Sequence, residues 1–433
     1  MKSQRFIWII CLLVLFLGYA CKKTPGDPGD GNNNGNSNGN QDIVYGDTAT
    51  ANVKMPQFDI SWPSLADSPW PLAKRTPQCM ARTPYLAPRD GEIEWEASTP
   101  GHKQLCPPVI GEDGTIYVTL EGGLSDKPGG LYAVDQNGSV KWHFGVQHEL
   151  EKFEGSCAIS ADGTIYVGTW GTEGLGFMYA LNPDSTVKWT LDLGSESLEE
   201  GNNMGIDGTL YTVTRDGKLH AISQEGESIW TVSGSGGFYS GGSIALSPDG
   251  STLYVEGLDL TLNAVSTTDG SVIWQLPLGS QFNQGIMVDN QGNVYFNIQD
   301  STSASFSCID PSGNIKWRYI TIMQDCVMDW DGYIYIFSYY TLHALDYEGQ
   351  FRWKRNFNSY SDWTPVLCDG ENIVFIQTRL GTIYGINQSG DIILEIDIIE
   401  NTTDMGAIGA QGNLYCSKGI PVSGYDCFLV AIK

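Results

Sequence analysis

One short strand pattern recurs eight times along this chain, and it constrains the fold more than any other feature. The pattern has the form G-T-I-Y-V and follows a turn rich in Asp and Gly. Its copies stand at 114–118, 163–167, 208–212, 251–255, 292–296, 332–336, 371–375 and 412–416. Recurrence at this spacing is the signature of a repeat protein, in which each unit is one supersecondary element.

A second repeated element follows the first seven copies and ends, in six of them, in a tryptophan. It reads LYAVDQNGSVKW at 131–142 and LHALDYEGQFRW at 342–353, whereas the seventh copy, at 383–394, has Leu394 in the last place. Both elements alternate apolar and polar residues, as half-buried strands do, and their turns carry Gly and Asn, which suit tight hairpins. The repeated tryptophans lie 36 to 47 residues apart, the length of a four-stranded blade, at Trp95, Trp142, Trp189, Trp230, Trp274, Trp317 and Trp353.

The two ends of the repeat region predict a closed ring. The last repeat ends with FLVAIK at 428–433 and lacks its tryptophan strand, while an extra strand of that type, GEIEW, stands at 91–95. We therefore expect an all-β fold: an eight-bladed β-propeller of four-stranded antiparallel blades over residues 91–433. The N-terminal strand at 91–96 should pair with 428–433 and complete the C-terminal blade, which removes the last open sheet edge.

The repeat resembles the tryptophan-docking motif of PQQ-like propellers. Ala133, Asp135, Gly138 and Trp142 carry the motif in one copy. In that family the tryptophan packs between adjacent blades, so the resemblance implies that the seven repeated tryptophans are structural docking residues. Burial of a large ring at the same place in every blade agrees with that role. The resemblance extends upstream into residues 46–90, which look like the lead-in segment of such proteins.

The N-terminus resembles a signal for export. Residues 1–20 combine Lys2 and Arg5 with an apolar run that is too short to span a bilayer, which is typical of a signal peptide. Cys21 ends a stretch, LGYAC, that resembles the lipobox of bacterial lipoproteins, so we expect it to be lipidated. Residues 21–45 then form a flexible Gly/Asn/Pro tether. The alternative is an ordinary cleaved signal before a disordered N-terminus.

The residue after the lipidated cysteine indicates the membrane. In the sorting rule known for lipoproteins of enteric bacteria, Asp at this place retains the protein in the inner membrane, and here the residue is Lys22. We therefore expect a lipid-anchored outer-membrane protein, on the periplasmic or the cell-surface side.

Charge and motif content exclude several functions. The chain has 50 acidic and 24 basic residues and a formal net charge of −26, so it should repel nucleic acid. Quinoprotein dehydrogenases, a related family, would have an adjacent Cys-Cys pair, a calcium ion held by Glu and Asn, and an Asp base, but this chain has no Cys-Cys dipeptide. The five His residues show no zinc-type spacing. We predict no enzyme activity, no catalytic residue, no metal and no cofactor, with a quinone-dependent dehydrogenase as a remote alternative.

Aromatic residues in the long, variable loops are the candidate ligand or partner site. These loops, between the outer strand of one blade and the inner strand of the next and between the two middle strands, share one face of a propeller. Such residues suit sugar stacking or a protein hot spot; the alternative is local loop packing. They are Trp170, Phe238, Tyr239, Phe282, Tyr360 and Trp363.

One disulfide is predicted from local geometry. Cys416 and Cys427 flank a ten-residue loop at the mouth of an expected hairpin, where Cα atoms come within bridging range. An exported protein would keep such a bond. The alternative is two unpaired thiols.

Two functions fit these features. The first is a non-enzymatic, lipid-anchored scaffold that mediates protein–protein interaction at the outer membrane, with outer-membrane protein assembly as its specific role. This function follows from similarity to the propeller lipoprotein of the β-barrel assembly machine. The second is a surface lipoprotein that binds a glycan or a small ligand. The partner is then a protein or a glycan, and the chain is a monomer or part of a complex.

Overall fold

The computed structural model describes residues 43–47, 50–99, 103–104, 107–121, 129–147, 151–153, 155–171, 175–194, 202–234, 236–280, 285–359, 366–398, 405–420 and 426–433. The predicted signal peptide and Cys21 lie outside these ranges. Within them the protein is all β, and it contains no helix that is long and apolar enough to cross a membrane.

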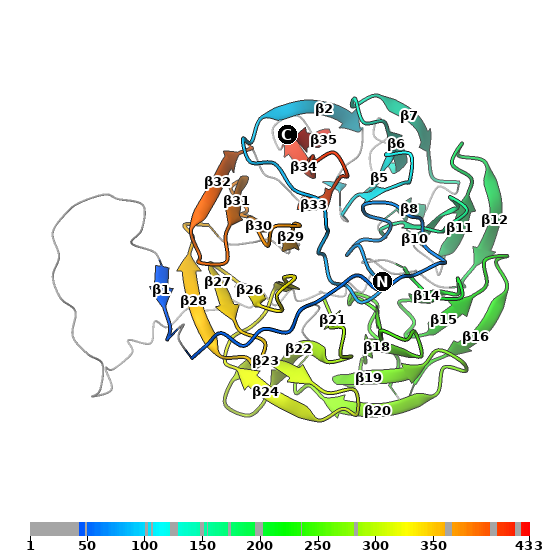
Figure 1. Cartoon of the computed structure of the whole chain (residues 1–433). Helices are drawn as coiled ribbons and strands as arrows, with labels where there is room; N and C mark the ends of the chain where they lie inside the picture. The colour runs from blue at the N-terminus through cyan, green and yellow to red at the C-terminus, as the bar shows by residue number, and fades with distance from the viewer. Residues whose placement is uncertain are drawn as a thin grey trace, which may run out of the picture. The chain divides into compact units, whose positions relative to one another are not determined.

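Eight antiparallel sheets form a ring, as Figure 1 shows, and each is a propeller blade with strands A to D from the centre outward. Blade 1 has β4 (Val109–Ile110), β5 (Ile116–Glu121), β6 (Gly130–Val134) and β7 (Val140–Phe144), and β3 (Lys103–Gln104) also pairs with β5. Blade 2 has β9 (Ala158–Ile159), β10 (Ile165–Gly171), β11 (Phe177–Leu181) and β12 (Val187–Asp192), and β8 (Glu151–Phe153) also pairs with β10. Blade 3 has β13 (Asn203–Met204), β14 (Leu210–Val213), β15 (Leu219–Ile222) and β16 (Ser228–Val232). Blade 4 has β17 (Ala245–Leu246), β18 (Thr252–Glu256), β19 (Thr261–Ser266) and β20 (Val272–Pro277).

The other four blades follow the same plan. Blade 5 has β21 (Met287–Val288), β22 (Val294–Gln299), β23 (Ala304–Ile309) and β24 (Ile315–Tyr319). Blade 6 has β25 (Asp325–Met328), β26 (Ile334–Ser338), β27 (Thr341–Leu345) and β28 (Phe351–Asn356), with β1 (Ile43–Tyr45) added outside β28. Blade 7 has β29 (Leu367–Cys368), β30 (Val374–Gln377), β31 (Thr382–Ile386) and β32 (Ile392–Asp397). Blade 8 has β33 (Met405–Ile408), β34 (Leu414–Ile420), β35 (Asp426–Ile432) and β2 (Ile93–Thr99).

Closure of the ring follows the prediction. The N-terminal strand β2 pairs antiparallel with β35, which places Trp95 opposite Ala431 in the last blade. Glu92 and Lys433 exchange backbone hydrogen bonds where the start of β2 meets the end of β35. The predicted eight-bladed propeller with an N-terminal strand in its C-terminal blade is confirmed. We call the side with the A–B and C–D turns the turn face, and the side with the B–C and D–A connections the loop face.

Each tryptophan of strand D lies over the C–D turn of the next blade. A Cβ added to Gly138 would lie 2.8 Å from the Trp95 indole, and Gly138 has a φ of +82°, so the turn needs glycine for both space and conformation. Trp95 Nε1 also donates a hydrogen bond of 2.8 Å to the Gln136 carbonyl. Equivalent bonds join Trp142 to Pro183, Trp189 to Gln224, Trp230 to Thr267, Trp274 to Pro311 and Trp353 to Gln388. This geometry agrees with the docking role that the family resemblance implies.

Leu394 stands at the docking position of blade 7. Its Cδ1 would lie 3.2 Å from a Cβ on Gly91, the glycine just before strand D of blade 8. Ile396 reaches the same glycine more closely, at 2.6 Å from that Cβ position. Two aliphatic side chains therefore share the site that a single indole fills elsewhere.

The predicted Cys416–Cys427 disulfide is wrong. The hairpin is longer than expected, because β34 continues to Ile420 and β35 begins at Asp426. In this register Cys416 faces Val430, and Cys427 faces Gly419, three residues further along β34. Three residues correspond to roughly 10 Å along a strand, beyond bridging range. Cys416 is a buried thiol without a disulfide.

The predicted tether also ends earlier than expected. Ile43, Val44 and Tyr45 form β1 against β28, with Ile43 opposite Arg355 and Tyr45 opposite Trp353. The tether therefore cannot extend to residue 45. The predicted lead-in segment begins on the outer edge of blade 6.

Candidate functional site

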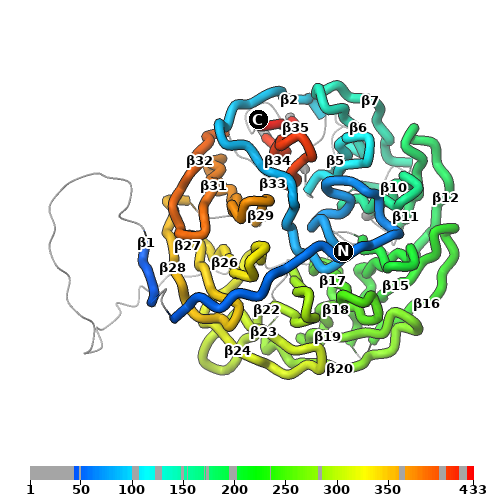
Figure 2. Tube along the Cα trace, in the orientation of Figure 1, coloured from blue at the N-terminus to red at the C-terminus, as the bar shows by residue number. Residues whose placement is uncertain are grey.

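The lead-in segment crosses the turn face and fills the mouth of the central channel. In Figure 2 the dark blue tube leaves β1 at the rim of blade 6 and runs to the middle of the ring, where it turns back toward β2. We call residues 62–85 the plug. This part of the chain has no regular strand of its own, and its backbone groups pair with the propeller instead.

The plug binds the inner strands of seven blades. A propeller leaves one edge of every strand A facing the channel, and those backbone groups need partners. The plug supplies them through Trp62 to Met204 in blade 3, Trp70 to Ile110 in blade 1, Pro71 to Ile159 in blade 2, Pro77 to Leu246 in blade 4, Gln78 to Val288 in blade 5, Arg82 to Met328 in blade 6 and Thr83 to Cys368 in blade 7. All seven are hydrogen bonds of 2.7 to 3.1 Å. The plug is therefore an integral part of the ring.

Arg82 is the most deeply buried cation of the plug. Its side chain is 2% exposed, lies over the Trp330 ring at 4.4 Å from the centroid, and donates Nη1 to the Met328 and Asp329 carbonyls. Burial lowers the pKa of its guanidinium to about 10. Trp70 and Ala81 beside it on the plug are fully buried. The channel mouth is thus filled by packed side chains.

Lys74 extends from the plug to the channel wall. Its Nζ lies 2.6 Å from Asp325 Oδ2, and both side chains are largely buried. Asp325 also accepts a hydrogen bond of 2.7 Å from the Val366 backbone nitrogen. One ion pair therefore joins the plug to blades 6 and 7.

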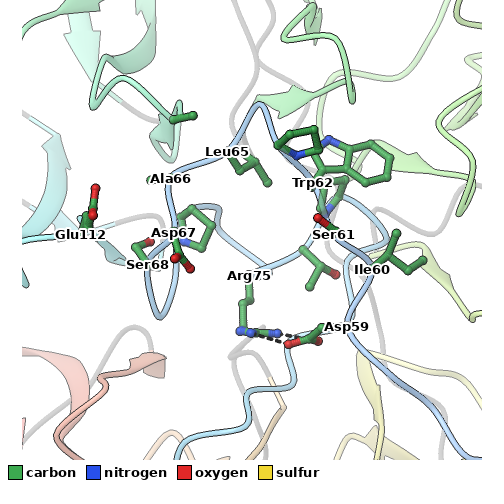
Figure 3. Close-up of a pocket in the computed structure, with 15 residues that line it drawn as sticks. Asp59, Ile60, Ser61, Trp62, Leu65, Ala66, Asp67, Ser68, Arg75 and Glu112 are labelled. Atoms are coloured by element: carbon green, nitrogen blue, oxygen red, sulfur yellow. Dashed lines mark hydrogen bonds and ion pairs between the residues drawn. The ribbon is translucent and has the colours of Figure 1, made fainter.

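A hollow of about 470 Å³ lies between two arms of the lead-in segment and blades 1 and 2. Figure 3 shows Arg75 at its floor in a bidentate ion pair with Asp59, at 2.9 and 2.7 Å. Arg75 also donates to the Pro69 and Arg82 carbonyls, so its donors serve to tie plug segments together. The exposed carboxylates of Asp67 and Glu112 also line the hollow. Among the described residues, no group of three or more His, Cys, Asp or Glu side chains could hold a metal ion.

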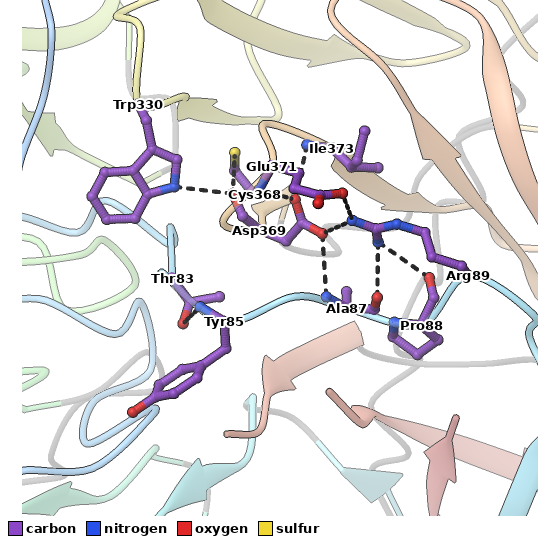
Figure 4. Close-up of polar contacts among 10 residues, drawn as sticks. All are labelled: Thr83, Tyr85, Ala87, Pro88, Arg89, Trp330, Cys368, Asp369, Glu371 and Ile373. Carbon is purple, nitrogen blue, oxygen red and sulfur yellow. Dashed lines mark hydrogen bonds and ion pairs between the residues drawn. The ribbon is translucent and has the colours of Figure 1, made fainter. Parts of the chain in front are cut away.

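Just after the plug, Asp369 of blade 7 fixes the lead-in segment, as Figure 4 shows. The Asp369 carboxylate accepts a 2.6 Å bond from Arg89 Nη2 and a 3.2 Å bond from the Ala87 backbone nitrogen. The Asp369 carbonyl accepts a bond from Trp330 Nε1. These contacts hold the lead-in segment on the turn face just before it enters β2.

Of the six predicted loop aromatics, the structure describes the side chains of Phe238 and Tyr239. Phe238 is 1% exposed and packs among core residues of blades 3 and 4, so it is a structural residue, as the alternative of local packing expected. Tyr239 is partly buried beside it, and its backbone nitrogen binds the Glu256 carbonyl. Trp170 lies in β10, opposite Lys152 of β8. Phe282, Tyr360 and Trp363 lie outside the described residues.

The plug was not foreseen as part of any site. Its sequence signals were a large indole at Trp62, another at Trp70 and the basic Arg82, all in a stretch without strand periodicity. Apolar and cationic side chains of this size in an irregular segment indicate that the segment packs against another part of the protein.

Comparison with known proteins identifies the family. The sequence model of the family described as outer membrane protein assembly factor BamB matches residues 127–390, more than half of the chain. The chain belongs to this BamB family. The structure of BamB from Moraxella catarrhalis aligns with a TM-score of 0.56 at 14% identity, over 79% of this chain and 99% of that one. No curated protein sequence matches the chain.

The same fold occurs in dehydrogenases. A europium-containing methanol dehydrogenase aligns with a TM-score of 0.63 at 10% identity, over 84% of this chain and 98% of that one. The quinohemoprotein alcohol dehydrogenase of Comamonas testosteroni aligns with a TM-score of 0.60 at 13% identity, over 86% of this chain and 80% of that one. At these identities the structural likeness shows a shared propeller fold. Membership of a family rests on the match to the BamB sequence model alone.

Proposed function

We propose that this protein is a non-enzymatic, lipid-anchored scaffold that binds protein partners at the outer membrane during assembly of outer-membrane proteins. Membership of the BamB family is the observation that carries the proposal. The predicted signal peptide and Cys21 support the anchor, and the family supports a periplasmic location at the outer membrane. A rigid ring with exposed rim strands offers a large surface to a partner.

The filled channel mouth supports a non-enzymatic role. A bound quinone needs a cavity of its own size and polar groups that converge on it. Here the plug occupies the turn-face mouth with Trp70, Ala81 and Arg82, all nearly inaccessible to solvent. No adjacent cysteine pair is present in the sequence, and the described residues hold no metal-binding group. The residues at this mouth do not fit a quinone–calcium centre.

Affinity purification from detergent-solubilised outer membranes tests the proposal. The native lipoprotein, carrying a C-terminal tag, should retain outer-membrane assembly proteins, and mass spectrometry identifies them. Retention of no membrane protein, together with binding of the chain to a glycan array, would instead favour the glycan-binding alternative. Burial of Phe238 weakens that alternative, because it removes one of the aromatic side chains on which it depends.

A further inference from the structure

The lead-in segment covers the inner turns of some blades and leaves that of blade 1 open. On blade 5 the backbone nitrogen of Phe58 donates to Asn290 Oδ1 at 2.8 Å. On blade 6 the backbone nitrogen of Met55 donates to the Asp331 carbonyl at 2.9 Å. In the A–B turn of blade 1, at 111–115, both acidic side chains are instead exposed. A part of the turn face beside blade 1 therefore remains open.

Two hollows occupy this open part, between the lead-in segment and the A–B turns of blades 1 and 2. The first, of about 470 Å³, contains the ion pair of Arg75 and Asp59. The second, of about 460 Å³, extends to Pro183 in the C–D turn of blade 2. Both have Ala66 and Glu112 in their walls, so they adjoin, and we call them together the turn-face groove. Each hollow has the size of pockets that hold small ligands.

Buried apolar side chains line both hollows. Trp62 and Leu65 of the plug line the first hollow, and each is 8% exposed. Tyr117 and Ile159 line the second hollow and are 4% and 2% exposed. The backbone nitrogen of Ala66, which separates the hollows, donates to the Ile159 carbonyl at 3.0 Å. The groove is therefore formed by packed residues, and a ligand can bind to it without first ordering its walls.

The cations near the groove are already paired with carboxylates. Arg75 is bound to Asp59 in the first hollow. Lys141 lies 3.1 Å from Asp113, which lines the second hollow, and Lys188 is paired in the same way, at 2.8 Å, in the A–B turn of blade 2. Because each pair is neutral, the net charge of the groove depends on its other groups.

Two carboxylates of the groove remain without a cation. Asp67 of the plug and Glu112 of blade 1 are both exposed and line the first hollow (Figure 3). Within the described chain, neither carboxylate is joined to a Lys, Arg or His side chain. The groove thus combines a net negative charge with apolar walls. This combination is complementary to a basic side chain that has apolar neighbours.

We propose that the turn-face groove binds a short segment of a partner protein in which a lysine or arginine lies among apolar residues. The basic group pairs with Asp67 and Glu112, while its aliphatic stem and the apolar neighbours pack along Ala66 and the buried walls. The net charge of −26 favours encounter with a basic partner. The inference rests on the proposed scaffold function, and it assigns one binding site of that scaffold to the turn face.

Selection from a phage-displayed library of random ten-residue peptides tests the ligand class without assuming its sequence. The full lipoprotein in detergent is immobilised, and the selected peptides should carry a lysine or arginine flanked by apolar residues. The same selection against Asp67→Asn/Glu112→Gln should not enrich these peptides. Selected peptides without basic residues, or no enrichment over an empty support, would contradict the proposal.

Fluorescence anisotropy of the most enriched peptide then measures the contribution of the two carboxylates. The Kd should rise at least about tenfold for Asp67→Asn/Glu112→Gln, because charge-assisted hydrogen bonds are lost. Ala161→Lys places a cation in the wall of the first hollow and should weaken binding by a similar factor. The control Glu348→Gln/Glu395→Gln removes the same charge from exposed positions of blades 6 and 7 and should change the Kd less than about twofold. Equal changes for the groove and control variants would assign binding to overall charge and contradict the site.

The remaining outcomes separate the groove from the scaffold function. Argininamide that displaces the peptide at an equal concentration would assign the groove to a small cation, which contradicts a protein ligand. Failure to select basic peptides, by a chain that still retains outer-membrane assembly proteins, contradicts the groove and leaves the scaffold function standing. Peptide binding that depends on Asp67 and Glu112, in a chain that retains no membrane protein, supports the groove and contradicts the scaffold function.

Discussion

Ile43 of β1 covers Trp353 of β28, and this contact distinguishes blade 6 from the other blades. Both side chains lie over Gly390 in the C–D turn of blade 7, where an added Cβ would lie 2.5 Å from Ile43 Cδ1 and 3.0 Å from the Trp353 ring. Trp353 is only 1% exposed, whereas the other six docking tryptophans remain partly exposed. The first residue of the described chain thus completes a blade interface.

The extra burial predicts that Trp353 is the most costly docking tryptophan to remove. Trp353→Ala should lower the free energy of unfolding by about 4 kcal/mol, and Trp274→Ala, at a partly exposed site, by about 2 kcal/mol. Urea unfolding of the two variants measures the difference. Equal losses would show that β1 adds nothing to the blade 6 interface.

The close approach of Trp95 predicts that Gly138 cannot be replaced. Gly138→Ala places a Cβ against the indole and also strains a φ of +82°, so it should destabilise the protein by about 3 kcal/mol. Gly194 has a φ of +68° with no atom within 4 Å of an added Cβ, so Gly194→Ala should show the backbone strain alone, about 1 kcal/mol. The difference between the two unfolding midpoints measures the contribution of the contact between Gly138 and Trp95. Identical midpoints would show that this contact contributes nothing.

The Lys74–Asp325 pair predicts strong coupling between plug and wall. Lys74→Met leaves a buried carboxylate without its cation and should cost about 3 kcal/mol. The double variant Lys74→Met/Asp325→Leu should cost clearly less than the sum of the two single changes. Lys141→Met, which breaks an exposed pair with Asp113, should cost less than about 1 kcal/mol. Strict additivity in the double-mutant cycle would mean that the pair does not hold the plug.

Burial of His343 predicts that the free energy of unfolding depends on pH. Burial lowers its pKa from 6.5 to about 4, and its Nδ1 lies 3.0 Å from the Tyr319 hydroxyl. The unfolded chain therefore binds the proton more readily than the folded one between about pH 4 and 6.5. Stability from the neutral ring is fully present above about pH 6.5 and falls by about 2 to 3 kcal/mol as the pH decreases to about 4.

Urea unfolding of His343→Phe across this pH range checks the assignment. The variant should lose the part of the pH dependence of its unfolding free energy that His343 causes, while it keeps an aromatic ring against Tyr319. A variant whose stability changes with pH as steeply as that of the native chain would assign the slope to other groups.

Local pattern made the ring predictable, and long-range contacts explain what was missed. Alternation, turn residues and the position of Trp95 are encoded within each repeat, so blade number and closure could be inferred. The plug depends on backbone hydrogen bonds to strands distant in sequence, such as that of Pro77 with Leu246. Local sequence periodicity does not reveal such bonds. The Cys416–Cys427 prediction failed because the sequence does not show that β34 runs on to Ile420. Phe238 is buried because the loop after β16 folds inward against blades 3 and 4.

The most direct test of the scaffold function is the amount of folded β-barrel protein in outer membranes of cells that lack this chain. The account predicts that several outer-membrane β-barrel proteins decrease, and that the full-length lipoprotein restores them. Quantitative mass spectrometry of purified outer membranes, with the transcript level of each barrel protein as control, gives the measurement. Unchanged barrel levels in the absence of the chain would contradict a role in outer-membrane protein assembly.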